Sequence, residues 1–264
     1  MLDRLLRPIV PYLPENNRIE RIWLLAKADY IGRYYGSALG VLWAFLNPLL
    51  QMLIYGVVFT TLFQVVMPNY ALYIFSGVIF WMLFAETTRS AINVFQTKRY
   101  LIENVAIPKI DLFLASLSCA VMAFTVNFSI YLIVSLFFPV HYSWLVFYAP
   151  VLIAVIGVIA FSVGLIIGAV SLYFRDLQHL WDIVLMAGWW VTPVLYGREQ
   201  AERIPLLLQL NPLAGVFLSL RDVLLYDTPP DPYVMLYDAG YALALWIIAY
   251  ALFTRLSRNA AELI

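Results

Sequence analysis

Charged residues are scarce in this chain of 264 residues. Asp, Glu, Lys and Arg together make up 12% of the sequence, whereas hydrophobic residues make up 64%. An average soluble domain carries about 25% charged residues, so this chain has too few to cover a surface that faces water. The scarcity excludes a soluble globular protein and predicts an all-α integral membrane protein. Because the formal net charge is zero, we expect no nucleic-acid partner.

Cysteine and histidine are almost absent as well. The single cysteine, Cys119, cannot form an intrachain disulfide, and we expect it to be a small buried side chain. The two histidines are His141 and His179, and no pattern of His, Asp and Glu in the sequence suits acid–base catalysis or a metal. We attribute the pair His179 and Asp182, three residues apart, to capping or solvation. No catalytic residue and no metal site are therefore predicted.

Six apolar runs reach the length of about 20 residues that a helix needs to cross a membrane. They cover residues 37–63, 72–95, 112–138, 144–174, 177–196 and 234–254. If the N-terminus is cytoplasmic, all but three of the 16 Lys and Arg residues lie on the inner side, the exceptions being Arg198, Arg203 and Arg221. Because basic residues collect in cytoplasmic loops, the sequence predicts six spans with both termini in the cytoplasm.

The segment before the first run has a helical pattern but is not a span. Over residues 18–35 one stripe is mostly apolar, while Glu20 and Lys27 lie away from it. The stripe consists of Ile19, Ile22, Trp23, Ala26 and Tyr30. This pattern predicts an amphipathic helix in the membrane interface, with packing against a soluble partner as the alternative. We assign its interface contacts to Arg21, Trp23, Lys27 and Arg33.

The domains follow from these segments. We expect a cytoplasmic N-terminal segment with the interface helix at 1–35, a transmembrane domain at 36–256 and a cytoplasmic tail at 257–264. Between the fifth and sixth runs, two apolar stretches at 204–210 and 213–226 are too short to span. Asn211 and Pro212 separate them and suit a helix N-cap and the first helical position. We therefore expect an outer re-entrant helix pair, and the alternative is a helix that lies flat on the outer surface.

Charged and small residues inside the apolar runs indicate how the predicted helices pack against one another. Glu86 and Arg89 lie three residues apart near the cytoplasmic end of the second run, and we expect them to neutralise each other. Small residues also recur every four positions, which lets helix backbones approach closely. They are Gly32, Gly36, Gly40 and Ala44, then Ala160, Gly164 and Gly168. This spacing predicts tight helix packing or a dimer seam.

Several stretches, in order, resemble one family of transporters. Residues 33–50, RYYGSALGVLWAFLNPLL, resemble the first span of polysaccharide-exporting ABC transporter permeases, the type-2 family that includes O-antigen, capsule and teichoic-acid exporters. Residues 98–108 resemble its cytoplasmic coupling helix. Residues 173–177 with 190–196 resemble its fourth-to-fifth junction and fifth span, and residues 210–213 resemble its re-entrant turn.

The resemblance implies a homodimer bound to two copies of a separate ATP-binding subunit. ATP and Mg would bind that subunit, and no cofactor is expected in this chain, which lacks the phosphate-binding motif G-x-x-x-x-G-K-[ST]. The implied activity is export of a lipid-linked glycan across the bacterial inner membrane, with membrane lipid around the spans. Residues 47–50 and the junction Arg175-Asp176 favour O-antigen, and teichoic acid or capsule glycan is the alternative. A membrane-embedded transferase acting on lipid-linked sugars is the alternative of a different class, and the missing His and carboxylate cluster counts against it.

The cytoplasmic stretch 98–111 is the predicted contact with the ATPase, because it is the inner loop between runs that can hold a short helix. We expect Pro108 to end that helix, which would transmit force to the spans as a rigid body. The predicted coupling residues are Arg99, Tyr100, Leu101, Ile102, Glu103, Asn104, Val105 and Pro108. The predicted conduit and substrate residues are Tyr34, Tyr35, Trp43, Trp189 and Trp190. For Trp189 and Trp190, an interfacial aromatic belt is the alternative to stacking on sugar rings.

Overall fold

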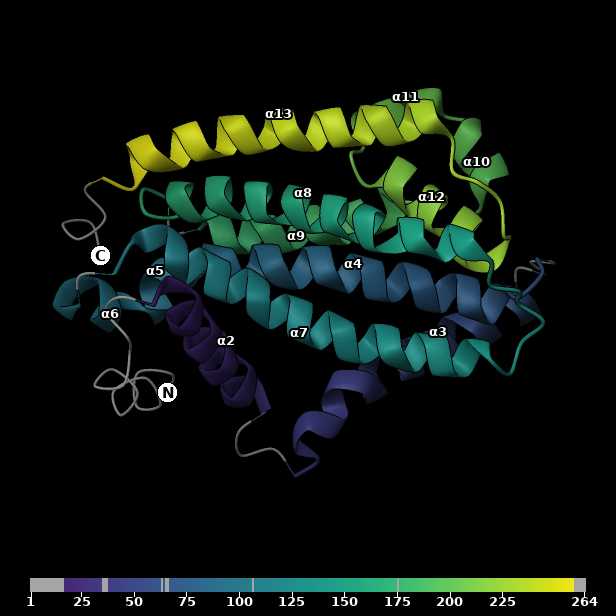
Figure 1. Ribbon diagram of the computed structural model, residues 1–264, viewed down its shortest axis with the longest axis horizontal. Coiled ribbons are helices and arrows are strands. Elements are labelled where there is room, and N and C mark those ends of the chain that lie inside the picture. The colour runs from purple at the N-terminus through teal and green to yellow at the C-terminus, as the bar shows by residue number, and fades with distance from the viewer. Residues whose placement is uncertain are drawn as a thin grey trace.

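The computed structural model describes residues 17–34, 38–62, 64, 67–105, 107–174 and 176–258, and every regular element in these ranges is helical (Figure 1). Four helices are long and apolar enough to cross a membrane. They are α4 (Tyr70–Ile92), α7 (Lys109–Ser135), α8 (Tyr148–Val170) with the 3-10 turn η3 (Trp144–Phe147) before it, and α13 (Pro232–Leu256). The all-α fold class is therefore confirmed, together with four of the six predicted spans.

The other two predicted spans contain shorter helices. The first run forms the 3-10 turn η2 (Gly40–Leu42) and α3 (Trp43–Thr61), and the fifth forms α9 (Leu177–Val191). The 15 residues of α9 extend about 22 Å at 1.5 Å per residue, less than the hydrocarbon thickness of about 30 Å. α9 ends because Thr192 is extended, with φ −85° and ψ 140°, as expected for a residue before proline.

α4 is the centre of the helical bundle. It packs against α3, α7 and α8, and α8 in turn packs against α13. Phe75 and Phe80 of α4 are fully buried in the main apolar core. Figure 1 shows that the start of α2 (Arg18–Tyr34), the helix α6 (Arg99–Asn104) and the end of α13 lie at one end of the bundle. The segment that was predicted to be outer, residues 197–233, lies at the opposite end.

The predicted small-residue spacing in α8 serves packing within this chain. A Cβ atom at Gly168 would lie 2.8 Å from the carbonyl oxygen of Ala91 in α4. At Gly164 it would lie 2.9 Å from the Cβ of the same alanine. Both contacts are too close for any larger side chain, so α8 and α4 meet along these glycines. Gly36 lies outside the described residues, and Gly40 has φ +51° with open space around it, so it belongs to a turn.

We expect Gly164→Leu to destabilise the protein by about 1–3 kcal/mol, because the larger side chain has no room against α4. Gly157→Leu is the matched control, since this glycine lies on the same helix with nothing within 4 Å of its Cβ position. Thermal unfolding of the purified proteins in detergent measures both effects. Equal melting temperatures for the two variants would contradict the close contact.

The predicted outer segment folds into three short helices, α10 (Arg198–Glu202), α11 (Pro205–Leu210) and α12 (Ala214–Leu225). The prediction that Asn211 caps the second helix is wrong, because α12 begins at Ala214 with Leu213 as its N-cap. The Asn211 side chain instead stabilises the turn by accepting a hydrogen bond from the Leu213 amide at 3.0 Å. α12 is buried along nearly its whole length, whereas Leu206 and Leu210 of α11 are exposed.

Candidate functional site

The helix α2 is attached to the bundle by a buried carboxylate. Asp111, in the first turn of α7, is fully buried and accepts hydrogen bonds from Arg21 at 2.6 Å and from Arg18 at 2.8 Å. The N-terminal end of a helix carries partial positive charge, which further favours a carboxylate at this position. The two arginines therefore hold α2 against the start of α7.

Two further ion pairs fix the rest of α2. Lys98, which is 2% exposed, donates to Asp29 at 2.6 Å. Arg33 pairs with Glu86 of α4 at 2.5 Å. These contacts join α2 to α4 and to the loop that carries α6, so the three elements form one charged cluster at this end of the bundle.

The predicted pairing of Glu86 with Arg89 is therefore wrong. Glu86 pairs with Arg33, and Arg89 pairs with Asp182 of α9 at 3.0 Å. Residues three apart share a helix face, but here both side chains reach across to neighbouring helices. Asp182, predicted as a capping or solvated partner of His179, thus connects α9 to α4.

The apolar stripe of α2 divides between two environments. Ala26 is fully buried against the bundle together with Leu25, while Ile19 and Trp23 are 81% and 52% exposed. Lys27 is also exposed. α2 therefore packs on its own bundle and still presents apolar side chains outward, as an interface helix does.

We expect Asp111→Asn to loosen α2, because it leaves two arginines facing a neutral side chain in a buried setting. Breaking a buried ion pair costs about 3–5 kcal/mol, so amide hydrogen exchange in α2 should speed up by about a hundredfold or more. Glu20→Gln is the control, because Glu20 is exposed on the same helix. Unchanged exchange in α2 of the Asp111 variant would show that the ion pairs do not hold this helix.

The predicted coupling stretch, residues 98–111, contains the short helix α6 and the first residues of α7, and the short helix α5 (Val94–Thr97) comes directly before it. Arg99 and Glu103 form an exposed ion pair at 2.6 Å on α6. Leu101, which was expected to be available for docking, is fully buried with Leu25 of α2 in an apolar cluster. The surface that α6 offers to a partner therefore consists of Arg99, Glu103 and Asn104.

Pro108 does not end this helix as predicted. α6 ends at Asn104, where Val105 turns extended with φ −132° and ψ 130°. Pro108 is instead the residue that precedes α7 as its N-cap. α6 is therefore only six residues long, and an extended connection leads from it to α7, which packs against α2.

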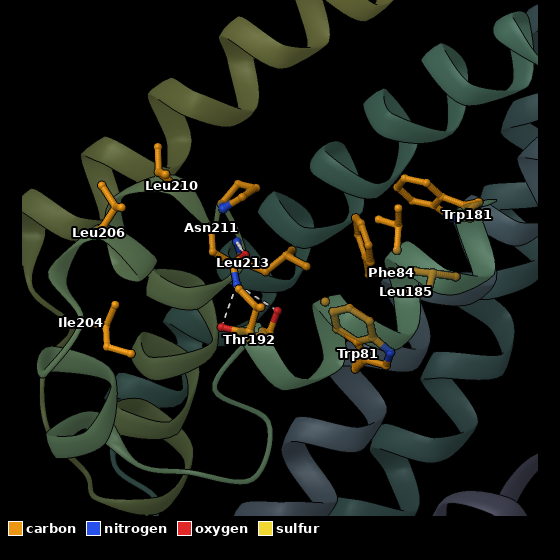
Figure 2. A pocket seen from close by; sticks show the side chains of 14 residues that line it. Trp81, Phe84, Trp181, Leu185, Thr192, Ile204, Leu206, Leu210, Asn211 and Leu213 are labelled. Atoms are coloured by element: carbon orange, nitrogen blue, oxygen red, sulfur yellow. Dashed lines mark hydrogen bonds between the residues drawn. The ribbon is translucent and has the colours of Figure 1, made fainter. Parts of the chain in front are cut away.

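Aromatic side chains gather where α4 and α9 meet. The rings of Trp81 in α4 and Trp189 in α9 lie 6.0 Å apart, edge to face, and Tyr55 of α3 lies 5.7 Å from Trp189. Beside them is a pocket of about 450 Å³ (Figure 2). Trp81, Phe84, Trp181 and Leu185 line one side, and the other side comes from α11 and the turn before α12.

The turn at Asn211 closes this pocket against the end of α9. The Asn211 amide donates to the hydroxyl of Thr192 at 2.9 Å, a contact drawn in Figure 2. Of the predicted conduit residues, Trp189 joins the aromatic cluster, whereas Trp190 and Trp43 are 59% and 45% exposed. Tyr35 and the side chain of Tyr34 lie outside the described residues.

The structural role of Arg221 was not predicted from the sequence, where it counted only as one of three basic residues on the predicted outer side. Arg221 lies in α12 and is 1% exposed. Its guanidinium donates to the carbonyl oxygens of Val194 at 2.7 Å and Tyr73 at 3.1 Å, and also to that of Pro193. The sequence did contain a signal for this role, because a basic residue inside an apolar stretch needs a partner at membrane depth.

Within the described part of the chain, no three His, Cys, Asp or Glu side chains lie close enough together to hold a metal ion. At one end of the bundle, buried ion pairs hold α2 against α7. Toward the other end lies the apolar and aromatic pocket.

Comparisons with known proteins agree on one family. The model of the family described as ABC-2 type transporter matches residues 20–225. The O-antigen export system permease protein RfbA of Myxococcus xanthus is 27% identical over 242 residues, which are 90% of this chain and 93% of that protein. The protein of the same name from Klebsiella pneumoniae is 28% identical over 247 residues, 91% of this chain and 93% of that protein.

Proposed function

Because this chain belongs to the ABC-2 type transporter family, we propose that it is the membrane subunit of an ATP-driven exporter for a lipid-linked polysaccharide of the O-antigen type. The observation that carries this proposal is the match to O-antigen export permeases over about nine-tenths of both chains. A match of this extent includes most of the helical bundle rather than one shared segment. The four long apolar helices suit a permease in the inner membrane.

The energy for export would come from a partner. The sequence has no phosphate-binding loop, so ATP and Mg would bind a separate ATP-binding subunit. We propose two copies of that subunit on a homodimer of this chain, arranged about a twofold axis. The conduit would lie between the protomers, with Trp43, Trp189 and Trp190 near it.

We propose a topology of six spans with both termini in the cytoplasm. α3 and α9 would complete the set, and the distribution of Lys and Arg supports this orientation. The start of α2, α6 and the end of α13 lie together at one end of the bundle (Figure 1), as one cytoplasmic face requires. α11 and α12 would form the outer re-entrant pair, which the burial of α12 supports.

The coupling element would be α6 together with its flanks. Its exposed charges would meet the ATPase, while the buried Leu101 ties α6 to the membrane helices. α2 would be the second contact, because its ion pairs join it to the same loop. Force applied to α6 would then reach α4 and α7 as a rigid body.

Reconstitution tests the function directly. Vesicles that hold the permease and the purified ATP-binding subunit should move a lipid-linked O-polysaccharide to the opposite leaflet with ATP and Mg, and should not do so without either subunit. Vesicles loaded with lipid-linked teichoic acid or capsule glycan identify the substrate class. Movement without the ATPase, or appearance of a new covalent sugar product, would contradict an exporter.

A further inference from the structure

A second cavity lies at the outer end of the bundle, apart from the aromatic pocket. It has a volume of about 580 Å³, within the range of small-ligand sites, and lies between α10, α11, α12 and the start of α13. Figure 1 shows these four elements gathered at the end away from α6. Asp238, Asp231 and Gln209 are among its lining residues, as are the rings of Tyr233 and Tyr237.

Asp238 is the unusual residue of this cavity. Its side chain is almost wholly enclosed at 2% exposure, and its Oδ2 atom has no hydrogen-bond partner within the described part of the chain. A buried carboxylate oxygen without a donor is costly. Gly215 of α12 makes room for it, because a Cβ atom there would lie 2.5 Å from Oδ2.

The other charged groups in the cavity wall are already engaged. Arg198 pairs with Asp222, and no Lys or Arg of the described residues forms an ion pair with Asp238. The Asp231 carboxylate accepts a hydrogen bond from the Tyr233 amide at 2.8 Å and so caps α13. The Tyr237 hydroxyl donates to the Gln209 carbonyl at 2.7 Å, which ties α13 to α11. Among the described residues of this wall, Asp238 is therefore the charged group whose Oδ2 atom lacks a donor, and a ligand could supply one.

The position suits a solute that arrives from outside. Asp238 is the seventh residue of α13, about 9 Å from its first residue along the axis. Tyr233 is 85% exposed and Tyr237 is 49% exposed at the rim. Aromatic faces beside a carboxylate and an amide match a sugar ring, which has apolar C–H faces and hydroxyl donors around its edge.

We propose that this cavity binds a sugar unit of the exported polysaccharide, with the Asp238 carboxylate accepting hydrogen bonds from sugar hydroxyls. The inference rests on the proposed function and adds a place where the glycan is held as it leaves. Hydrogen bonds to a charged acceptor are about twice as strong as neutral ones, so the carboxylate would supply most of the polar recognition.

The test uses the complex of permease and ATP-binding subunit in nanodiscs free of phosphatidylethanolamine. Its probe is O-polysaccharide released from its lipid, with binding followed by ligand-observed NMR. Asp238→Asn should weaken binding about tenfold or more. It should not lower the melting temperature, because the substitution removes a charge that has no partner in the protein. Glu199→Gln is the control, since Glu199 lies nearby in an exposed ion pair with Arg203, and it should bind like the unaltered complex.

The outcomes separate this site from the proposed function. Equal binding by Asp238→Asn and the unaltered complex would overturn the sugar site, as would failure of an exporting complex to bind the released polysaccharide. An effect of the substitution that appears only when phosphatidylethanolamine is present would assign the cavity to a lipid amine headgroup and also overturn it. Failure of the unaltered complex to export lipid-linked polysaccharide would instead contradict the proposed function.

Discussion

Replacing Arg221 with methionine is expected to destabilise the protein by about 2–6 kcal/mol, because two buried carbonyl oxygens would each lose a hydrogen-bond donor at about 1–3 kcal/mol. Arg221 is 1% exposed and its cation lies 3.5 Å from the centre of the Tyr73 ring. Its donors satisfy backbone carbonyls of α4 and of the Pro193–Val194 segment after α9. The side chain thus connects α12, α4 and the end of α9.

Methionine fills a similar volume but donates no hydrogen bond. The carbonyl oxygens of Pro193 and Val194 would lose this donor, and each unsatisfied group costs about 1–3 kcal/mol. The Tyr73 oxygen would still accept a hydrogen bond from the Ser76 hydroxyl at 2.9 Å. Gly77 shows how tightly the guanidinium is enclosed, because a Cβ atom there would clash with its Nη2 atom and would lie 2.6 Å from the Val194 oxygen. Lysine is not expected to rescue the site, since its single ammonium cannot match the planar fork of donors.

Thermal and chemical unfolding in detergent measures this effect. Arg203→Met is the matched control, because the Arg203 side chain is 70% exposed in a surface ion pair with Glu199, and such pairs contribute about 0–1 kcal/mol. A melting temperature for Arg221→Met close to that of the control variant would show that the buried contacts are not needed for stability.

The long helices could be predicted from the sequence because apolar length is a local property. α4 begins two residues and α7 three residues before the start of the predicted run, and each helix ends three residues before the end of its run. The difference at α7 has a physical cause. Asp111 was placed in a loop because it is charged, but inside the helix it is satisfied by arginines of α2. Only the tertiary structure shows that partner.

The candidate site was harder to predict, because it depends on which helices meet. Trp189 and Trp190 are neighbours in the sequence, yet the first packs on Trp81 and the second is 59% exposed. Arg221 and Asp238 are charged residues within apolar stretches, and their partners or lack of partners cannot be derived from spacing. The prediction for residues 98–111 was correct in giving a short helix but wrong about the residue that ends it.

Exchanging the two charges of α6, in the double variant Arg99→Glu with Glu103→Arg, is expected to abolish coupling between the permease and its ATPase. The two residues are four apart and exposed, so the exchange keeps an ion pair within the helix. Glu before a basic residue at this spacing is the more favourable order, and α6 should stay folded. What changes is the charge presented to the partner at each position. Like charges brought together at an interface cost several kcal/mol, enough to lower export about tenfold or more.

The chain contains its own control for this exchange on the opposite end of the bundle. Glu199 and Arg203 form an exposed pair with the same spacing on the outer segment, and exchanging them should leave export unchanged. Transport of lipid-linked polysaccharide and the ATPase rate of the complex are measured together in vesicles. The α6 exchange should lower transport and remove the response of the ATPase to the permease, with the melting temperature unchanged. Full transport in the α6 variant would exclude this surface as the coupling contact, and equal losses in both variants would exclude a specific role for α6.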